Sequence, residues 1–288
     1  MKIGSISLGE IWKPARMLTP STGKRPSPLA SDIRLTLALA QREIESRYRG
    51  SLLGMVWSML TPLLMLGVYT FVFGTVFKSR WSTGDSHTPP AEFAVILFTG
   101  LIIFQIFSET VIRAPSLMIG YSNYVKKVVF PLEILVPVAL CNSLFHGLIS
   151  FAILLPFLFL EFGGIPLTAL WLPVVILPLL MMTLGIGWFL ASIGTYSRDI
   201  GQVIGTLTTA LLFLGPIFFP TSSLPGWVQS WVSLNPIAIP IEQARKALVF
   251  GQTPEWGILL SYYLVAIIVC AVGFLWFQKT RKGFADVL

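Results

Sequence analysis

The sequence predicts an all-α polytopic membrane protein with six transmembrane helices. Only 11% of its 288 residues are charged, whereas soluble domains average about 25%, and its mean hydropathy is +0.79. Uncharged stretches long enough to cross a bilayer, which takes about 20 apolar residues each, recur along the chain. This composition excludes a soluble enzyme, and 21 Phe and 9 Trp exclude a disordered chain.

The residues before the first span divide into two parts. Residues 1–30 are expected to be a flexible cytoplasmic extension, because residues 19–28 are basic and rich in Pro and Ser. Residues 31–49 predict an amphipathic helix, typical of one that rests in the membrane interface, with an ordinary soluble helix as the alternative. Its apolar residues recur at steps of three or four: Ile33, Leu37, Ala40, Ile44 and Tyr48.

Six apolar segments follow, over about 52–77, 93–112, 132–160, 169–194, 201–219 and 256–277. The first has no charge over 26 residues, which as a helix measures about 39 Å. The second ends with Glu109 and Arg113, spaced as a helical i,i+4 ion pair.

The distribution of Lys and Arg predicts that both termini are cytoplasmic. With the N-terminus inside, 16 of the 20 Lys and Arg fall on inner segments, which is the excess that cytoplasmic loops show. The outer ones are Lys78, Arg80, Arg245 and Lys246. We therefore attribute the net charge of +7 to the orientation of the chain in the membrane and not to nucleic-acid binding.

Residues 220–255, between spans five and six, are too apolar for a loop and too interrupted for a span. They predict two short helices, 224–234 and 236–250, that re-enter the outer leaflet with Trp at headgroup depth. Non-helical backbone at that depth must be buried or line a cavity, so the pair is a candidate gate, with an inert surface hairpin as the alternative.

Two details of this candidate gate follow from its sequence. Asn235-Pro236 is typical of a helix N-cap followed by Pro at the first helical position. In the second helix, Glu242, Arg245 and Lys246 are expected to face away from the apolar side. The gate residues are Trp227, Trp231, Asn235, Pro236, Glu242 and Arg245.

The spans contain no source of energy for transport. Their middle positions lack Asp, Glu, Lys and Arg, and a lone His146 in a span is typically hydrogen-bonded to a neighbouring helix. No cluster of residues suggests catalysis, and the two Cys lack metal-ligand spacing. We expect no catalytic residue, metal or bound cofactor in this chain, and therefore a partner that supplies work at the cytoplasmic face.

The segment 121–131, between spans two and three, is a candidate contact for such a partner. It is short, cationic and aromatic, and predicts a helix parallel to the membrane that presents Tyr121, Tyr124, Lys126 and Lys127 outward. The alternative is that this Lys pair only fixes the orientation of the chain in the membrane. Other polar residues are expected at cytoplasmic helix ends: Arg47, Arg49, Glu109, Arg113, Glu133, Arg198 and Asp199.

Four blocks in order carry a family resemblance. They are residues 40–77, residues 108–135 with F-P-x-E after a Lys-rich segment, SRDIGQ at 197–202, and N-P…R within 235–254. Over about residues 31–285 the chain resembles ABC-2-type permeases of the Wzm and KpsM kind, the transmembrane subunits of O-antigen and capsule exporters. Val136 before Pro137, and GPIFFP at 215–220, depart from the family pattern without changing the class.

The resemblance implies a homodimer in the bacterial inner membrane, bound to two ATPase subunits that use ATP and Mg²⁺. Residues 31–288 would be the permease domain and 31–49 its cytoplasmic interface helix. Tyr121–Phe130 would be the coupling helix, seated in a groove of the ATPase. A path between protomers, lined mainly by spans one and five, would take a lipid-linked glycan past the outward gate helices.

Aromatic side chains suit such a path, because pyranose rings have apolar faces that stack on them. The candidates are Tyr69, Phe71, Phe73, Phe213, Phe218 and Phe219, with contact to lipid or core as the alternative. We expect the permease subunit of an ATP-driven exporter of lipid-linked, O-antigen-like or capsular polysaccharide. The alternatives are an ABC-2 exporter of teichoic acid, a drug or a lipid and, in another class, a membrane glycosyltransferase.

Overall fold

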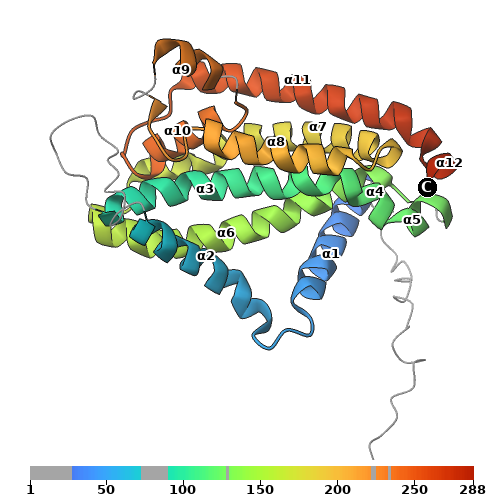
Figure 1. The fold of residues 1–288 in the computed structure, drawn as a ribbon, viewed down its shortest axis with the longest axis horizontal. Coiled ribbons are helices and arrows are strands. Elements are labelled where there is room, and N and C mark those ends of the chain that lie inside the picture. The colour runs from blue at the N-terminus through green and yellow to red at the C-terminus, as the bar shows by residue number, and fades with distance from the viewer. Residues whose placement is uncertain (1–27, 73–89, 128–129, 222–224, 233–234) are drawn as a thin grey trace, which may run out of the picture.

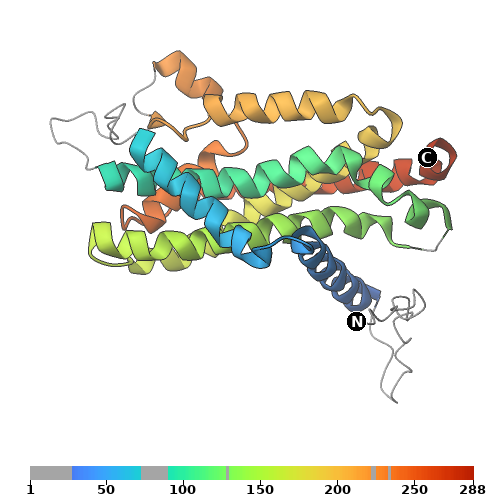
Figure 2. The same cartoon turned by 60° about the horizontal axis from the view of Figure 1, so that its bottom comes forward.

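The computed structural model describes residues 28–72, 90–127, 130–221, 225–232 and 235–288, and these are helical with no strand. Figures 1 and 2 show an elongated bundle whose long helices run side by side. Its helices are α1 (Pro28–Tyr48), α2 (Trp57–Tyr69), α3 (Pro90–Arg113), α4 (Leu117–Gly120), α5 (Ser122–Lys127), α6 (Leu135–Phe162), α7 (Leu172–Tyr196), α8 (Ile200–Leu214), α9 (Gly226–Val232), α10 (Ala238–Leu248), α11 (Trp256–Thr280) and α12 (Phe284–Val287). The predicted 1–30 extension lies largely outside these residues.

Five helical segments of the described chain are long and apolar enough to cross a membrane: Gly54–Val72, Ala91–Gly120, Leu132–Phe162, Leu167–Tyr196 and Trp256–Val287. They match predicted spans one to four and six. The predicted fifth span, 201–219, appears as α8, which has 15 residues and measures about 22 Å against a bilayer core of about 30 Å. It ends at Leu214 because Gly215 is extended and Pro216 follows.

The second span forms the centre of the bundle. In the most apolar stretch of Ala91–Gly120, 72% of the residues are buried, whereas only 11% are buried in Gly54–Val72. Figure 1 shows α3 running between α6 on one side and α7 and α8 on the other. Helix α2 therefore presents most of its apolar surface outward.

Close packing of α7 on α11 depends on two glycines. A Cβ added at Gly273 would collide with the Gly185 backbone, and one added at Gly185 would collide with the Val269 carbonyl. Small residues at such crossings let transmembrane helices approach each other, which maximises van der Waals contact. This contact holds the last span against the bundle.

The two ends of the bundle differ. Helices α4, α5 and α12 gather at one end, called here the α5 end, and α9 and α10 lie at the opposite end, called the α10 end (Figure 1). Helix α1 leans against the bundle near the α5 end and joins α2 at a projecting turn (Figures 1 and 2). The candidate coupling and gate segments are thus at opposite ends.

Candidate functional site

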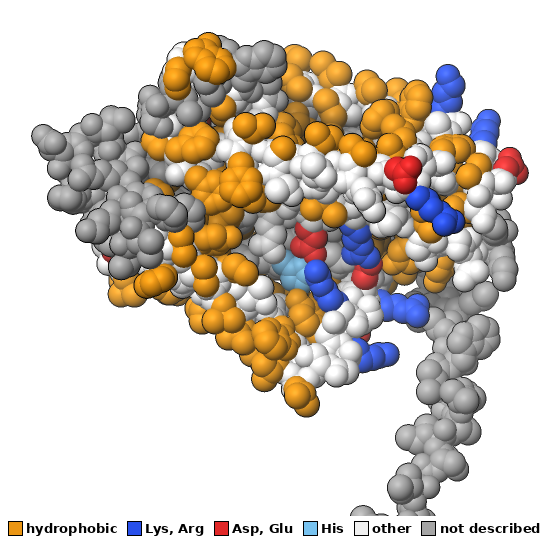
Figure 3. Space-filling model, in the orientation of Figure 1, with side chains coloured by type: hydrophobic (Ala, Val, Ile, Leu, Met, Phe, Trp, Pro, Cys, Tyr) orange, Lys and Arg blue, Asp and Glu red, His pale blue; other side chains and the backbone are white. Residues whose placement is uncertain are grey.

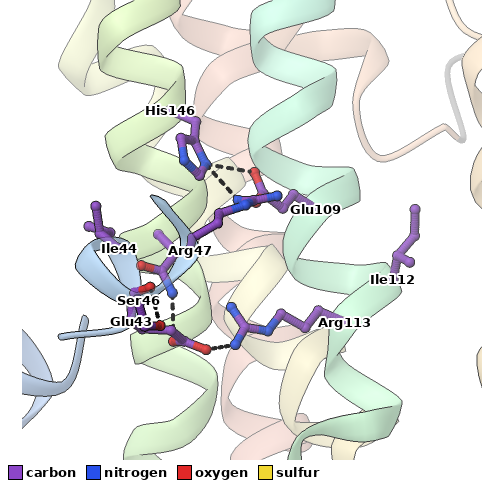
Figure 4. Close-up of a pocket in the computed structure, with 9 residues that line it drawn as sticks. Glu43, Ile44, Ser46, Arg47, Glu109, Ile112, Arg113 and His146 are labelled. Carbon is purple, nitrogen blue, oxygen red and sulfur yellow. Dashed lines mark hydrogen bonds and ion pairs between the residues drawn. The ribbon is translucent and has the colours of Figure 1, made fainter. Parts of the chain in front are cut away.

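A polar cluster joins α1 to the bundle at the α5 end. Glu43 and Arg47 on α1 face Glu109 and Arg113 on α3 and form two ion pairs, with Arg47–Glu109 above Glu43–Arg113 in Figure 4. Arg47 Nη1 lies 2.5 Å from Glu109 Oε1, and the Arg113 guanidinium pairs with Glu43. The expected Glu109–Arg113 pairing along one helix is therefore wrong, because both side chains pair with α1.

His146 of α6 completes one side of this cluster. Its Nε2 lies 2.9 Å from the Tyr48 hydroxyl, and its Nδ1 lies 3.3 Å from Glu109 Oε2 and 3.2 Å from Arg47 Nη1. Burial raises the pKa of the Tyr48 phenol above its ordinary value. The prediction that this histidine contacts neighbouring helices is confirmed.

Glu43 also links α1 to two further elements, α6 and the end of α4. Its carboxylate accepts a hydrogen bond of 2.6 Å from Asn142 Nδ2 on α6 and one of 3.3 Å from the Tyr121 hydroxyl at the end of α4. The Asn142 Oδ1 atom is buried and has no hydrogen-bond donor among the described residues. Glu43 and Asn142 are functional candidates that sequence reasoning missed.

A cavity of about 560 Å³ opens between α1, α3 and α6, lined by the two ion pairs, Asn142 and His146. A second hollow of about 210 Å³ shares Arg47, Glu109 and His146 with it and extends to Trp57 at the start of α2. Figure 3 shows charged side chains gathered here, with hydrophobic side chains toward the α10 end and further charged side chains toward the α5 end. We call the two hollows together the polar cleft.

The predicted coupling segment lies at the same end. Tyr124 packs between Tyr121 and Phe130, with ring centroids 5.9 and 4.9 Å away. Both tyrosines are half-buried, and their role as an outward contact for a partner stays a prediction. The side chains of Lys126 and Lys127 lie outside the described part of the structure.

Among the other predicted helix-end residues, Glu133 lies at the α5 end, whereas Arg49 lies in the turn that joins α1 to α2. Glu133 pairs with Arg281 across 3.0 Å, which ties the start of the α6 segment to the end of α11. Arg49, Arg198 and Asp199 are exposed. These three do not join the polar cleft, whereas Arg47, Glu109 and Arg113 do.

At the α10 end, Arg245 is buried, with 2% of its surface exposed. Its Nε donates to the Ile96 carbonyl at 2.9 Å and Nη2 to the Ile217 carbonyl at 2.8 Å, while Nη1 donates to the Pro216 carbonyl. The expectation that this residue faces away from the packed side of its helix is wrong. Its guanidinium instead joins α10 to α3 and to the end of α8.

The candidate gate helices form, with shifted boundaries. Helix α10 begins at Ala238, so Asn235 is not its N-cap; Asn235 Oδ1 accepts a hydrogen bond from the Ile237 amide, 3.2 Å away. Trp227 on α9 is 73% exposed, and Glu242 accepts a hydrogen bond from Thr221. Pro236 is half-buried, and the Trp231 side chain lies outside the described residues.

The aromatic path candidates occupy several positions. Phe213 stacks on Phe218 with centroids 5.6 Å apart and an interplanar angle of 19°. Phe213 and Phe71 are each 62% exposed. Tyr69 and Phe219 are half-buried, and Phe73 lies outside the described residues.

Metal chemistry has no obvious place in the part of the chain that the structure describes. There, no three His, Cys, Asp or Glu side chains lie together as metal ligands. Cys141 and Cys270 are both free thiols. The polar cleft is therefore a site of ion pairs and hydrogen bonds.

Comparison with known proteins identifies the family. The profile of the ABC-2 type transporter family matches residues 34–249. The chain belongs to this family. Helices α1 to α10, with both the polar cleft and the Arg245 contacts, fall almost wholly within the match.

Individual relatives match nearly end to end. The O-antigen export system permease protein RfbA of Myxococcus xanthus is 27% identical, covering 88% of this chain and 94% of the relative. The polysialic acid transport protein KpsM of Escherichia coli is 28% identical, covering 85% and 92%. The daunorubicin resistance ABC transporter permease protein DrrB1 of Streptomyces coeruleorubidus is 24% identical, covering 87% and 93%.

Proposed function

We propose that this chain is the transmembrane permease subunit of an ATP-driven exporter that moves lipid-linked, O-antigen-like polysaccharide out of the cytoplasm of a bacterium. The observation that carries the proposal is the nearly end-to-end similarity to permeases named for O-antigen export and polysialic acid transport. The five long apolar helices agree with a permease in the inner membrane.

The power source in this proposal is a pair of separate ATPase subunits. They bind ATP and Mg²⁺, and the permease itself performs no chemistry and holds no cofactor. The ATPases contact the α5 end, where Tyr121, Tyr124, Lys126, Lys127 and Phe130 form the coupling segment. Both termini are then cytoplasmic, since α1 and α12 approach this end (Figure 1).

A homodimer supplies the path. Supporting it, the apolar stretch of Gly54–Val72 is only 11% buried, and Thr208 is the buried residue of α8. Two such faces, brought together across a symmetry axis, enclose a route lined by Phe71, Phe213 and Phe218. Helices α9 and α10 then close the route at its outer end.

Gene deletion in the source bacterium tests the function. We expect surface polysaccharide to disappear and lipid-linked glycan to accumulate inside, because synthesis continues without export. Re-expression of the permease with its ATPase should restore the surface glycan, and an ATPase unable to hydrolyse ATP should not.

The second candidate is a drug exporter, which the similarity to the daunorubicin resistance permease favours. Deletion would then lower drug tolerance and leave the surface glycan intact, which contradicts the first proposal. A membrane glycosyltransferase would be indicated if the purified chain alone transferred sugar from a donor.

A further inference from the structure

We propose that the polar cleft binds the hydroxyl groups of a sugar unit near the lipid end of the glycan, before the glycan enters the path. This inference rests on the proposed function and assigns substrate recognition to residues of α1, α2, α3 and α6. Four observations support it: the donors and acceptors of the cleft, an unsatisfied amide oxygen, its charge balance, and its shape.

The cleft offers both donors and acceptors within a small volume. Two guanidinium groups, two carboxylates, the Asn142 amide and His146 line the larger hollow. A sugar hydroxyl donates one hydrogen bond and accepts others, so such a mixture matches it. Similar polar groups are expensive within a membrane bundle and are typically retained there for function.

Asn142 provides the most specific indication of a ligand. It is 3% exposed and lines the larger hollow. Its Nδ2 donates to Glu43 Oε2 at 2.6 Å, which fixes the orientation of the amide. Among the described residues, the opposite atom, Oδ1, is buried without a hydrogen-bond donor. A buried acceptor left unpaired costs free energy, which a ligand hydroxyl would recover once the side chains that cover the atom move aside.

The charge balance favours a hydroxyl ligand over an anion. Arg47 already pairs with Glu109, and Arg113 with Glu43, so each guanidinium faces a carboxylate. A phosphate group would have to displace these carboxylates and approach their negative charge. An uncharged hydroxyl can bond to either member of a pair without separating them.

The shape of the cleft suits a ring attached to a lipid. The larger hollow, of about 560 Å³, adjoins the smaller one, with which it shares Arg47, Glu109 and His146. In the smaller hollow, Trp57 is 42% exposed and offers an aromatic surface for the apolar face of a pyranose. In Figure 3, hydrophobic side chains lie toward the α10 end from the cleft, and further charged side chains lie toward the α5 end, so the cleft lies between an apolar and a charged part of the surface. A sugar next to its lipid carrier therefore reaches the cleft without leaving the membrane boundary.

Two substitutions at opposite sides of the cleft test the inference in the full permease–ATPase complex. Asn142→Leu is nearly isosteric and removes the unsatisfied oxygen together with the Nδ2 donor to Glu43, and Trp57→Ala removes the aromatic surface. The probe is the water-soluble oligosaccharide released by mild acid from the bacterium's own surface glycan. We expect each substitution to weaken its binding, measured by calorimetry, at least tenfold and to slow export.

Matched controls separate recognition from folding. Trp57→Phe keeps an aromatic ring and should retain binding, and Glu133→Gln alters an ion pair at the same end but outside the cleft. Equal oligosaccharide binding by wild type, Asn142→Leu and Trp57→Ala would overturn the inference. So would displacement of the oligosaccharide by inorganic pyrophosphate, which would identify an anion site.

The outcome for the cleft is distinguishable from the outcome for the proposed function. If the wild-type gene restores surface glycan and both cleft variants restore it equally, with unchanged binding, the function stands and the cleft inference fails. If deletion leaves the surface glycan intact, the proposed function fails first, whatever the cleft binds.

Discussion

At the scale of single residues, Arg245 shows how a charge is accommodated inside the bundle. Its guanidinium donates to three backbone carbonyls, two of which follow the end of α8, where carbonyls lack helical donors. Gly100 makes room for it, because an added Cβ would lie 2.6 Å from Arg245 Nη2. One side chain thereby donates hydrogen bonds to three backbone carbonyls, which the hydrocarbon of a membrane could not do.

We expect Arg245→Leu to destabilise the protein by about 3 kcal/mol, because it orphans three buried carbonyls. Thermal unfolding in detergent, followed by loss of the native elution peak, measures the effect. Lys246→Leu is the control, since its partner Glu255 is about half-exposed and such surface pairs contribute roughly 0–1 kcal/mol. Equal melting temperatures for the two variants would contradict this role of Arg245.

At the scale of elements, contacts between helices depend on small residues and on reciprocal ion pairs. Helix α7 meets α11 at Gly185 and Gly273, while α1 meets α3 through Arg47–Glu109 and Glu43–Arg113. The first contact allows no larger side chain. The ion pairs of the second contact can separate and form again at a small cost in free energy, because their groups are partly exposed to solvent.

Gly273→Leu should separate α7 from α11, since its side chain would occupy the position of the Gly185 backbone. We expect a loss of about 3 kcal/mol or failure to accumulate in the membrane, which immunoblotting of membrane fractions detects. Gly257→Leu on the same helix is the matched control, because a Cβ there meets nothing within 4 Å. Normal accumulation of the Gly273 variant would show that the contact tolerates separation.

The coupling segment makes a prediction at the same scale. Lys126→Glu combined with Lys127→Glu should weaken co-purification of the ATPase subunit and slow export at least tenfold, because the cationic end of α5 becomes anionic. Arg198→Glu, an exposed change in a neighbouring loop, is the control. Unchanged co-purification and export for the double variant would remove α5 from the ATPase contact.

At the scale of the whole molecule, the bundle is incompletely covered. Helices α2 and α8 expose large apolar side chains, among them Leu63, Leu64, Val203 and Leu207. Lipid or a second copy must cover these faces, because such a surface is not stable in water. The proposed homodimer uses them for its path and leaves α11 toward lipid.

A disulfide between symmetry-related α9 helices tests the homodimer and the gate together. In a background with Cys141→Ala and Cys270→Ala, we expect Trp227→Cys to crosslink two protomers, since Trp227 is 73% exposed. Oxidation should block export and reduction should restore it, measured as surface glycan. Full export despite a confirmed crosslink would exclude α9 as the moving gate.

The class of the protein was predictable from sequence, because burial in a bilayer requires long uncharged helices whatever their packing. Spans one to four and six begin within two residues of their predicted starts. Spans two and six run on past their predicted ends, to Gly120 and Val287, and residues 73–77 of span one lie outside the described residues. The fifth was predicted too long, since Gly215 and Pro216 end the helix within an apolar run. Composition alone does not distinguish an apolar helix from an apolar turn that is buried.

The candidate site was only partly predictable. Glu-x-x-x-Arg occurs at 43–47 and again at 109–113. The repeat is compatible with ion pairs between the two helices, but the same spacing equally favours an ion pair within each helix. Likewise, Arg245 was assigned to an exposed face because its three carbonyl acceptors belong to residues far away in sequence. Sequence by itself determined the medium in which each segment lies. Tertiary structure decided the partner of each polar group, because hydrogen bonds and ion pairs depend on atoms that only folding brings together.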